Sequence, residues 1–152
     1  MIKKIPTETE TFMFHNENPK GHRTGDCVIR AIAAAEGKTW DEVFTSLCEL
    51  ALKYKEMPND KKVYSRYLEA QGWKKCKQPR KDDNSKYTGS QWCIKMSVVN
   101  PDGAAGNVIA HIGGHHIVCI KPTNHGDGIN CRYKICDTWD SSRGCIGNYW
   151  IK

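Results

Sequence analysis

The fold is organised around one stretch, Thr24-Gly25-Asp26-Cys27-Val28-Ile29-Arg30-Ala31-Ile32-Ala33-Ala34-Ala35. Its small residues predict a turn, and the alanine-rich part predicts a helix that begins at Cys27 and ends near Glu36, before Gly37. Unpaired backbone N–H groups and the helix dipole favour negative charge at a helix N-terminus, so a thiol there is shifted toward the reactive thiolate. The pattern equally fits a cysteine buried as a small apolar residue. Cys27 is therefore a candidate nucleophile whose role depends on the rest of the chain.

The last third of the chain contains side chains of the kind that a nucleophilic cysteine requires. Segment 113–120 predicts a turn, two histidines and an apolar strand, and segment 133–140 predicts a strand that ends in Asp137. Cysteine, histidine and acid, in this order, are the nucleophile, base and orienting group of a generalised triad. Adjacent side chains on a strand point to opposite faces, so His115 and His116 cannot both face Cys27. Alternation leaves the choice open, because apolar residues share the parity of each histidine.

The position of Asp137 in its strand favours it as the acid. It shares its parity with Cys131, Tyr133 and Ile135, so it lies at the end of a face that is predicted to be buried. A buried carboxylate requires a partner, and the Nδ1–H group of a histidine is a suitable one. Asp137 also fits a turn cap together with the next residue, and Asp140 is the reserve acid.

These segments together resemble the papain-like cysteine protease superfamily. Gly25-Asp26-Cys27-Val28-Ile29-Arg30-Ala31 opens a helix with a cysteine, a histidine heads an apolar strand, and Asp137-Thr138-Trp139 stands where papain-like enzymes carry Asn-Ser-Trp. Segment 147–152 resembles the closing strand of such domains. More narrowly, the set resembles small bacterial and prophage-encoded members. The resemblance implies a papain-like fold and a peptidase, isopeptidase or amidase that forms an acyl-enzyme on Cys27 and acts on a protein or peptide.

The resemblance also implies roles for individual residues. It favours His116 over His115 as the base, with Asp137 orienting it and Trp139 shielding the histidine–acid hydrogen bond from water. The family usually places a glutamine six residues before the cysteine as an oxyanion donor, and this sequence has Gly21 there. The backbone N–H of Cys27 supplies one donor, and the candidates for the second are Asn16, Asn18 and His22.

Length and composition set the remaining expectations. The chain has 152 residues, 39% of them hydrophobic, which suits a single domain over residues 1–152. No apolar run approaches the roughly 20 residues of a transmembrane helix, and Met1-Ile2-Lys3-Lys4 is followed by polar residues, so a cytoplasmic protein without membrane contact is expected. The eight cysteines are expected to be free thiols, and their spacing predicts no metal site. No cofactor is expected.

The order of the predicted elements indicates an α+β fold. Helices are predicted at 27–36, from Trp40 to about Met57 behind a capping box of Thr39 and Glu42, and around 63–68, ending at Gly72. Strands are predicted at 91–96, 107–112, 115–121, 130–137 and 149–152, and the first 23 residues as loop or short extended structure. N-terminal helices would then pack on a C-terminal antiparallel sheet.

Much of the net charge of +6 lies in segment 74–86, which also contains Asp82 and Asp83. Such a run is typical of a solvated loop, but it also fits an alternative function. In that alternative the scaffold is catalytically silent and binds nucleic acid or a protein partner through segment 74–86. Only the charge of the segment favours it.

Overall fold

A computed structural model describes residues 4–22, 24–124 and 130–152. Within these residues the helices are α1 (Cys27–Glu36), α2 (Trp40–Tyr54), α3 (Lys61–Ala70) and α4 (Gly89–Val99). The strands are β1 (Phe12–Phe14), β2 (Lys74–Cys76), β3 (Val108–Ile112), β4 (His116–Thr123), β5 (Arg132–Asp137) and β6 (Ile146–Ile151). The fold is therefore α+β, as the order of the predicted elements indicates.

The strands form one sheet in the order β1-β5-β4-β3-β6-β2. Neighbouring strands are antiparallel, except that the edge strand β1 runs parallel to β5. The expected antiparallel sheet is thus corrected to a mixed sheet. The two edge strands have three residues each. Strand β1 lies in the first 23 residues, which were predicted as loop or short extended structure, and β2 lies in the basic segment 74–86, which was predicted as a loop. Residues 1–3 and 23 lie outside the described part of the chain.

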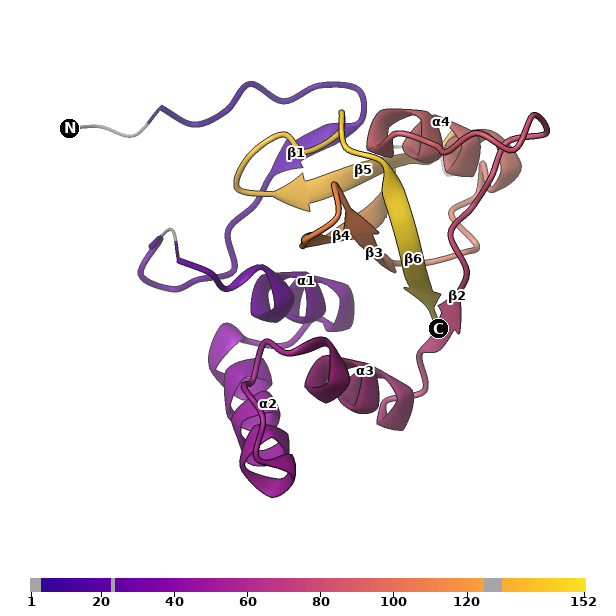
Figure 1. Cartoon of the computed structure of the whole chain (residues 1–152). Helices are drawn as coiled ribbons and strands as arrows, with labels where there is room; N and C mark the ends of the chain where they lie inside the picture. The colour runs from indigo at the N-terminus through magenta and orange to yellow at the C-terminus, as the bar shows by residue number, and fades with distance from the viewer. Residues whose placement is uncertain (1–3, 23, 125–129) are drawn as a thin grey trace.

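Helices cover both faces of the sheet (Figure 1). On one face α1, α2 and α3 pack against Ile109, Ile117 and Cys119 of the central strands. On the other face α4 packs against the residues of opposite parity, such as Val118 and Ile120. Each central strand is buried on both sides, which explains why their sequences are apolar almost throughout.

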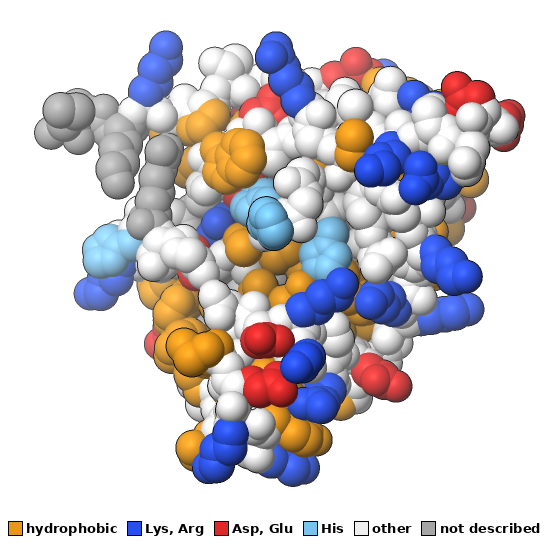
Figure 2. All heavy atoms as spheres, viewed as in Figure 1, with side chains coloured by type: hydrophobic (Ala, Val, Ile, Leu, Met, Phe, Trp, Pro, Cys, Tyr) orange, Lys and Arg blue, Asp and Glu red, His pale blue; other side chains and the backbone are white. Residues whose placement is uncertain are grey.

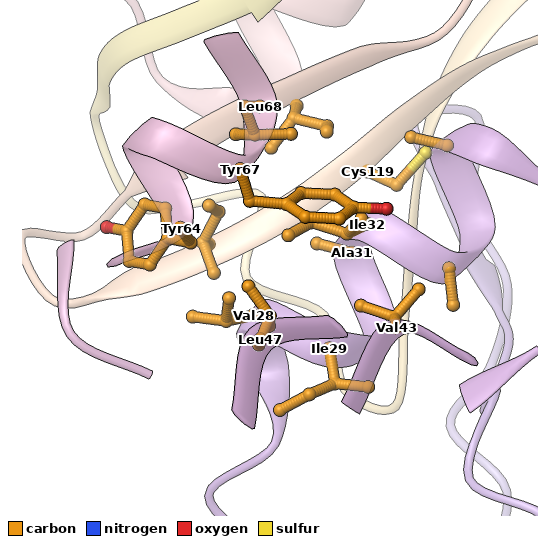
Figure 3. Close-up of a cluster of buried hydrophobic side chains, with 14 of the residues drawn as sticks. Val28, Ile29, Ala31, Ile32, Val43, Leu47, Tyr64, Tyr67, Leu68 and Cys119 are labelled. Atoms are coloured by element: carbon orange, nitrogen blue, oxygen red, sulfur yellow. The ribbon is translucent and has the colours of Figure 1, made fainter. Parts of the chain in front are cut away.

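Helix α1 lies between the sheet and the other two helices of its layer. Figure 3 shows Val28, Ile29 and Ile32 among the side chains of α2 and α3. Ile32 is fully buried, and the alanines of α1 allow the helix to approach β4 closely. The helix ends where Gly37 adopts the left-handed conformation, as predicted. The N-terminus of α1 is thereby fixed at one end of the sheet.

The predicted strand at 91–96 is wrong, because this segment lies within helix α4. Thr88 and Gln91 form a capping box, in which the Thr88 side chain accepts from the N–H of Gln91 and the Gln91 side chain accepts from the N–H of Thr88. Trp92, Cys93 and Met96 face the sheet with helical spacing. A short apolar run fits either a strand or a helix, but the capping box favours the helix.

The remaining boundaries differ little from the predictions. The capping box of Thr39 and Glu42 is present, but α2 ends at Tyr54 rather than near Met57, because Lys55 adopts a left-handed conformation. All eight cysteines are free. Among the described residues, no helix has both the length and the apolar character needed to span a membrane.

Candidate active site

Cys27 is the first residue of α1, as predicted. The preceding residue, Asp26, occupies the N-cap position but makes no side-chain capping hydrogen bond. Its carboxylate instead accepts from Arg30, Asn18 and the indole of Trp40. The first backbone N–H groups of α1 therefore have no side-chain cap from Asp26, and the positive end of the helix dipole faces the Cys27 thiol.

His116 is the first residue of β4, directly after the turn that joins β3 to β4. Gly113 and Gly114 in this turn both have positive φ, which residues with a side chain rarely adopt. The Nε2 atom of His116 lies 2.5 Å from the Oδ2 atom of Asp137, the last residue of β5. The expected histidine–acid pair is present, but through Nε2 rather than Nδ1, so that Nδ1 is the ring nitrogen left for Cys27.

Cys27 and His116 form a coupled pair. Burial raises the pKa of the Cys27 thiol, but the hydrogen bond and the positive charge of His116 lower it more, and the resulting pKa lies below the ordinary value. Burial likewise lowers the pKa of His116, but the hydrogen bonds and negative charges of Asp137 and Cys27 raise it to about 9. Both shifts act in the direction of a thiolate beside an imidazolium.

Arg30 connects the carboxylate of Asp137 to helix α1. Its Nη1 donates to Asp137 Oδ1 at 2.6 Å, and its Nε donates to Asp26 Oδ1 at 2.8 Å. The backbone N–H of Thr138 also donates to Asp137 Oδ1 at 2.7 Å. Asp137 and Asp26 are almost fully buried, and one guanidinium serves both carboxylates. Two donors on Oδ1 therefore fix the orientation in which Asp137 presents Oδ2 to His116.

The reserve residues take no part in the histidine–acid pair, whereas Trp139 lies beside it. The Trp139 ring packs against the His116 ring at 5.0 Å between centroids, although about half of the Trp139 side chain remains exposed. His115 is an exposed turn residue. Asp140 is also exposed, and its carboxylate accepts from the N–H of Ser142. The structure thus brings His116 and Asp137 together, and not His115 or Asp140.

The three predicted oxyanion donors lie in the loop before α1. Asn18 donates its amide to Asp26 and accepts from the N–H of Lys20, so its side chain stabilises the loop. Asn16 accepts from the N–H of Asn18 at 3.0 Å, and His22 is exposed. None of the three lines the cavity beside Cys27.

Two cavities meet next to the cysteine. One, of about 290 Å³, is lined by Cys27 and by polar side chains from α3 and from the β3–β4 region. The other, of about 350 Å³, is lined by apolar side chains such as Trp40, Phe44 and Met57. Gly25 and Asn59 line both. Figure 2 shows histidine side chains near the centre of this face, and another at its left edge.

Arg30, Tyr64 and His111 were not among the predicted site residues. Asp26 and Arg30 are four residues apart, which is the spacing of an ion pair on a helix, and Cys27 lies between them in the sequence. The sequence pattern placed Tyr64 on the apolar side of α3 and gave it no functional role. The Tyr64 hydroxyl lies 2.7 Å from His111 Nε2, a contact between segments 47 residues apart that no local pattern indicates.

No group of three or more His, Cys, Asp or Glu side chains in the described residues is arranged to hold a metal ion. Within the basic segment, β2 forms an edge strand of the sheet, next to β6. There the Lys75 ammonium lies over the Trp150 ring, and the Lys81 ammonium over the Tyr87 ring. These contacts are intramolecular, and they give the nucleic-acid alternative no support beyond charge.

Comparison of the chain with protein-family models, with curated proteins and with solved structures found no match. Function is therefore inferred from the site itself.

Proposed function

We propose that this protein is a papain-like cysteine hydrolase that cleaves an amide or isopeptide bond in a peptide or protein. One observation carries the proposal: His116 is hydrogen-bonded to Asp137 and lies close enough to Cys27 to lower the pKa of its thiol. This is the relation of orienting acid, base and nucleophile that nucleophilic catalysis requires. The pair of cavities that meets at Gly25 is additional support, because it offers space for substrate groups next to the thiol.

The proposed mechanism has two stages. The Cys27 thiolate attacks the carbonyl carbon, and the backbone N–H of Cys27 stabilises the oxyanion that forms. His116 then donates its Nδ1 proton to the departing amine, and the carbon–nitrogen bond breaks to leave a thioester on Cys27. In the second stage His116 takes a proton from water, the hydroxide attacks the thioester, and the acid product leaves with the thiolate restored.

Asp137 and Arg30 act through His116. Asp137 holds the imidazole through Nε2, so that Nδ1 remains available to Cys27 and to the leaving group. Arg30 holds Asp137 and adds a positive charge that lowers the pKa of Cys27 further, against the effect of burial. We therefore class Cys27 and His116 as catalytic residues, and Asp137 and Arg30 as positioning residues.

A proteome-derived peptide mixture tests the proposal, because it presents many different sequences to the protein at once. The wild-type protein is incubated with the mixture, and new peptide termini are identified by mass spectrometry. We expect new termini with the wild type and with Cys145→Ser, which removes an exposed cysteine, and none with Cys27→Ser. Equal cleavage by Cys27→Ser would contradict the proposal. A folded wild type that yields no new termini, from peptides or from intact proteins, would also count against it.

A further inference from the structure

The cavity of about 290 Å³ beside Cys27 has a polar wall that the proposed chemistry does not use. Its wall includes Asn59, Lys61, Tyr64, His111 and His115. Each of these side chains has a hydrogen-bond donor in at least one of its ordinary forms, and Lys61 carries a positive charge. None of the described residues that line this cavity is an aspartate or a glutamate.

The inner part of this wall is rigid. Tyr64 is 6% exposed, and its hydroxyl is bonded to His111 Nε2. The His111 ring also packs edge-on against Trp150, with 5.0 Å between the centroids. Figure 3 shows the Tyr64 oxygen pointing out of the apolar cluster that holds the ring. Two polar groups are thus held in place at one side of the nucleophile, as a binding site for a small group requires.

The protonation states of the wall fit a ligand that accepts hydrogen bonds. Burial lowers the pKa of His111 to about 4, and the charges of Lys61 and Lys75 add to this effect, so the imidazole is neutral near pH 7. Burial raises the pKa of Tyr64 to about 12, and the charges of Cys27 and Asp60 contribute, so the phenol keeps its proton. The Asp60 carboxylate itself accepts from the N–H of Lys62 as the cap of α3. The positive potential at His111 comes from lysines.

We propose that this cavity binds a carboxylate of the substrate, next to the scissile bond, through the Lys61 ammonium and the Tyr64 hydroxyl. In this arrangement the neutral His111 donates from Nε2 to the Tyr64 oxygen, so that the Tyr64 proton is free for the ligand. The inference rests on the proposed function and names the substrate class: a peptide with either an acidic side chain or a free C-terminal carboxylate adjacent to the cleaved bond. A carboxylate accepts several hydrogen bonds and is attracted by the lysine, whereas a basic group would meet Lys61 with repulsion.

Two alkylating reagents of nearly equal size test the inference without a known substrate. Iodoacetate carries a carboxylate and iodoacetamide is neutral, and peptide mapping gives the rate of each at Cys27. The ratio of the iodoacetate rate to the iodoacetamide rate should fall about fivefold in Lys61→Met. A fivefold change is the scale of one partly exposed charge pair. The ratio should also fall in Tyr64→Phe. It should stay unchanged in Lys62→Met, which removes the same charge from an exposed neighbour outside the cavity wall.

The outcomes separate this inference from the proposed function. If iodoacetamide modifies Cys27 no faster than the exposed Cys145, the proposed function fails. If Cys27 reacts fast but the rate ratio is the same in wild type, Lys61→Met and Tyr64→Phe, only the carboxylate site is overturned. The iodoacetamide rate also reports whether each variant keeps the folded site.

Two matched inhibitor pairs then distinguish the source of the carboxylate. Acetyl-glutamyl chloromethyl ketone, against its glutaminyl analogue, presents a side-chain carboxylate. Iodoacetyl-glycine, against iodoacetyl-glycinamide, presents a terminal one. For each pair, the rate of the charged inhibitor at Cys27 is divided by the rate of the neutral one. The pair with the larger ratio identifies the source of the carboxylate, provided that the preference is lost in Lys61→Met. No preference in either pair overturns the inference.

Discussion

At the residue scale, the proposed chemistry depends on proton transfer between Cys27 and His116. Asp137 accepts a hydrogen bond from one side of the imidazole, and Cys27 lies at the other. A proton moved from sulfur to nitrogen leaves two opposite charges, each stabilised by the other and by the network behind it. Because the sites are coupled, the pair titrates as a unit.

The Asp137→Asn variant tests the acid in this pair. Burial lowers the pKa of His116, and the hydrogen bond and charge of Asp137 oppose this effect most strongly, so the pKa should fall from about 9 in the variant. The His116 ring signal in an NMR titration measures it. In the proposed mechanism the imidazolium protonates the leaving amine, so the proposed hydrolysis should be lost as pH rises through about 9 in wild type, and at lower pH in the variant. Asp140→Asn is the control, and an equal pKa of His116 in both variants would contradict the assignment.

Arg30 is the other residue on which the site depends. It is the partner of two buried carboxylates, so the Arg30→Met variant leaves both without their cation. The free energy of unfolding should fall by about 3–5 kcal/mol, the usual cost of breaking a buried ion pair from one side. Urea denaturation measures it. In the control Arg66→Met, which removes an exposed guanidinium stacked on Tyr54, the loss should be below about 1 kcal/mol. Equal losses in the two variants would show that Arg30 contributes no more to stability than an exposed arginine does.

At the scale of the elements, α4 and the sheet meet at a glycine. A Cβ atom on Gly89 would lie 2.6 Å from Ile112 Cδ1, 2.9 Å from Ile135 Cδ1 and 3.2 Å from the backbone of Ser142. The two isoleucines are buried and have little room to move. The N-terminus of α4 therefore approaches the sheet as closely as a residue without a side chain allows.

The Gly89→Ala variant should lower the free energy of unfolding by about 1–3 kcal/mol, because the added methyl group overpacks the contact. Gly25→Ala is the matched control, since a Cβ atom there meets nothing within 4 Å and the φ of Gly25 is not positive. Its effect should stay within about 0.5 kcal/mol. Chemical denaturation of both variants measures the difference, and a neutral Gly89→Ala would show that the helix can shift away from the sheet.

The strength of the local sequence pattern decides which elements could be predicted. Helix α1, the capping box of α2 and the apolar strands β3 to β5 have strong local patterns, and the structure confirms them. Helix α4 was mistaken for a strand although Thr88 and Gln91 have the same capping chemistry as Thr39 and Glu42. Strands β1 and β2 are short edges that exist because β5 and β6 offer free hydrogen-bonding groups, so their own residues carry little signal.

At the scale of the whole molecule, the site depends on contacts between distant segments. Cys27 and Asp137 were predicted from local context, whereas alternation left His115 and His116 open and only the family resemblance favoured His116. In the structure His116 follows the turn at Gly113 and Gly114 and contacts Asp137. Arg30 was within the stretch that decided the fold, yet its role depends on a carboxylate 107 residues away. Such pairings follow from the topology of the sheet, and no periodicity in the chain predicts them.

The activation of Cys27 should therefore be a property of the folded molecule alone. The most direct test of this claim compares the rates at which iodoacetamide alkylates Cys27 and the exposed Cys145, by peptide mapping, in buffer and in concentrated urea. The measurement is made near pH 6, where an ordinary thiol of pKa about 8.5 is almost wholly protonated. We predict that native Cys27 reacts at least about 10-fold faster than Cys145, because its pKa is lowered, and that the difference vanishes in urea. A native Cys27 that reacts no faster than Cys145 would contradict the account.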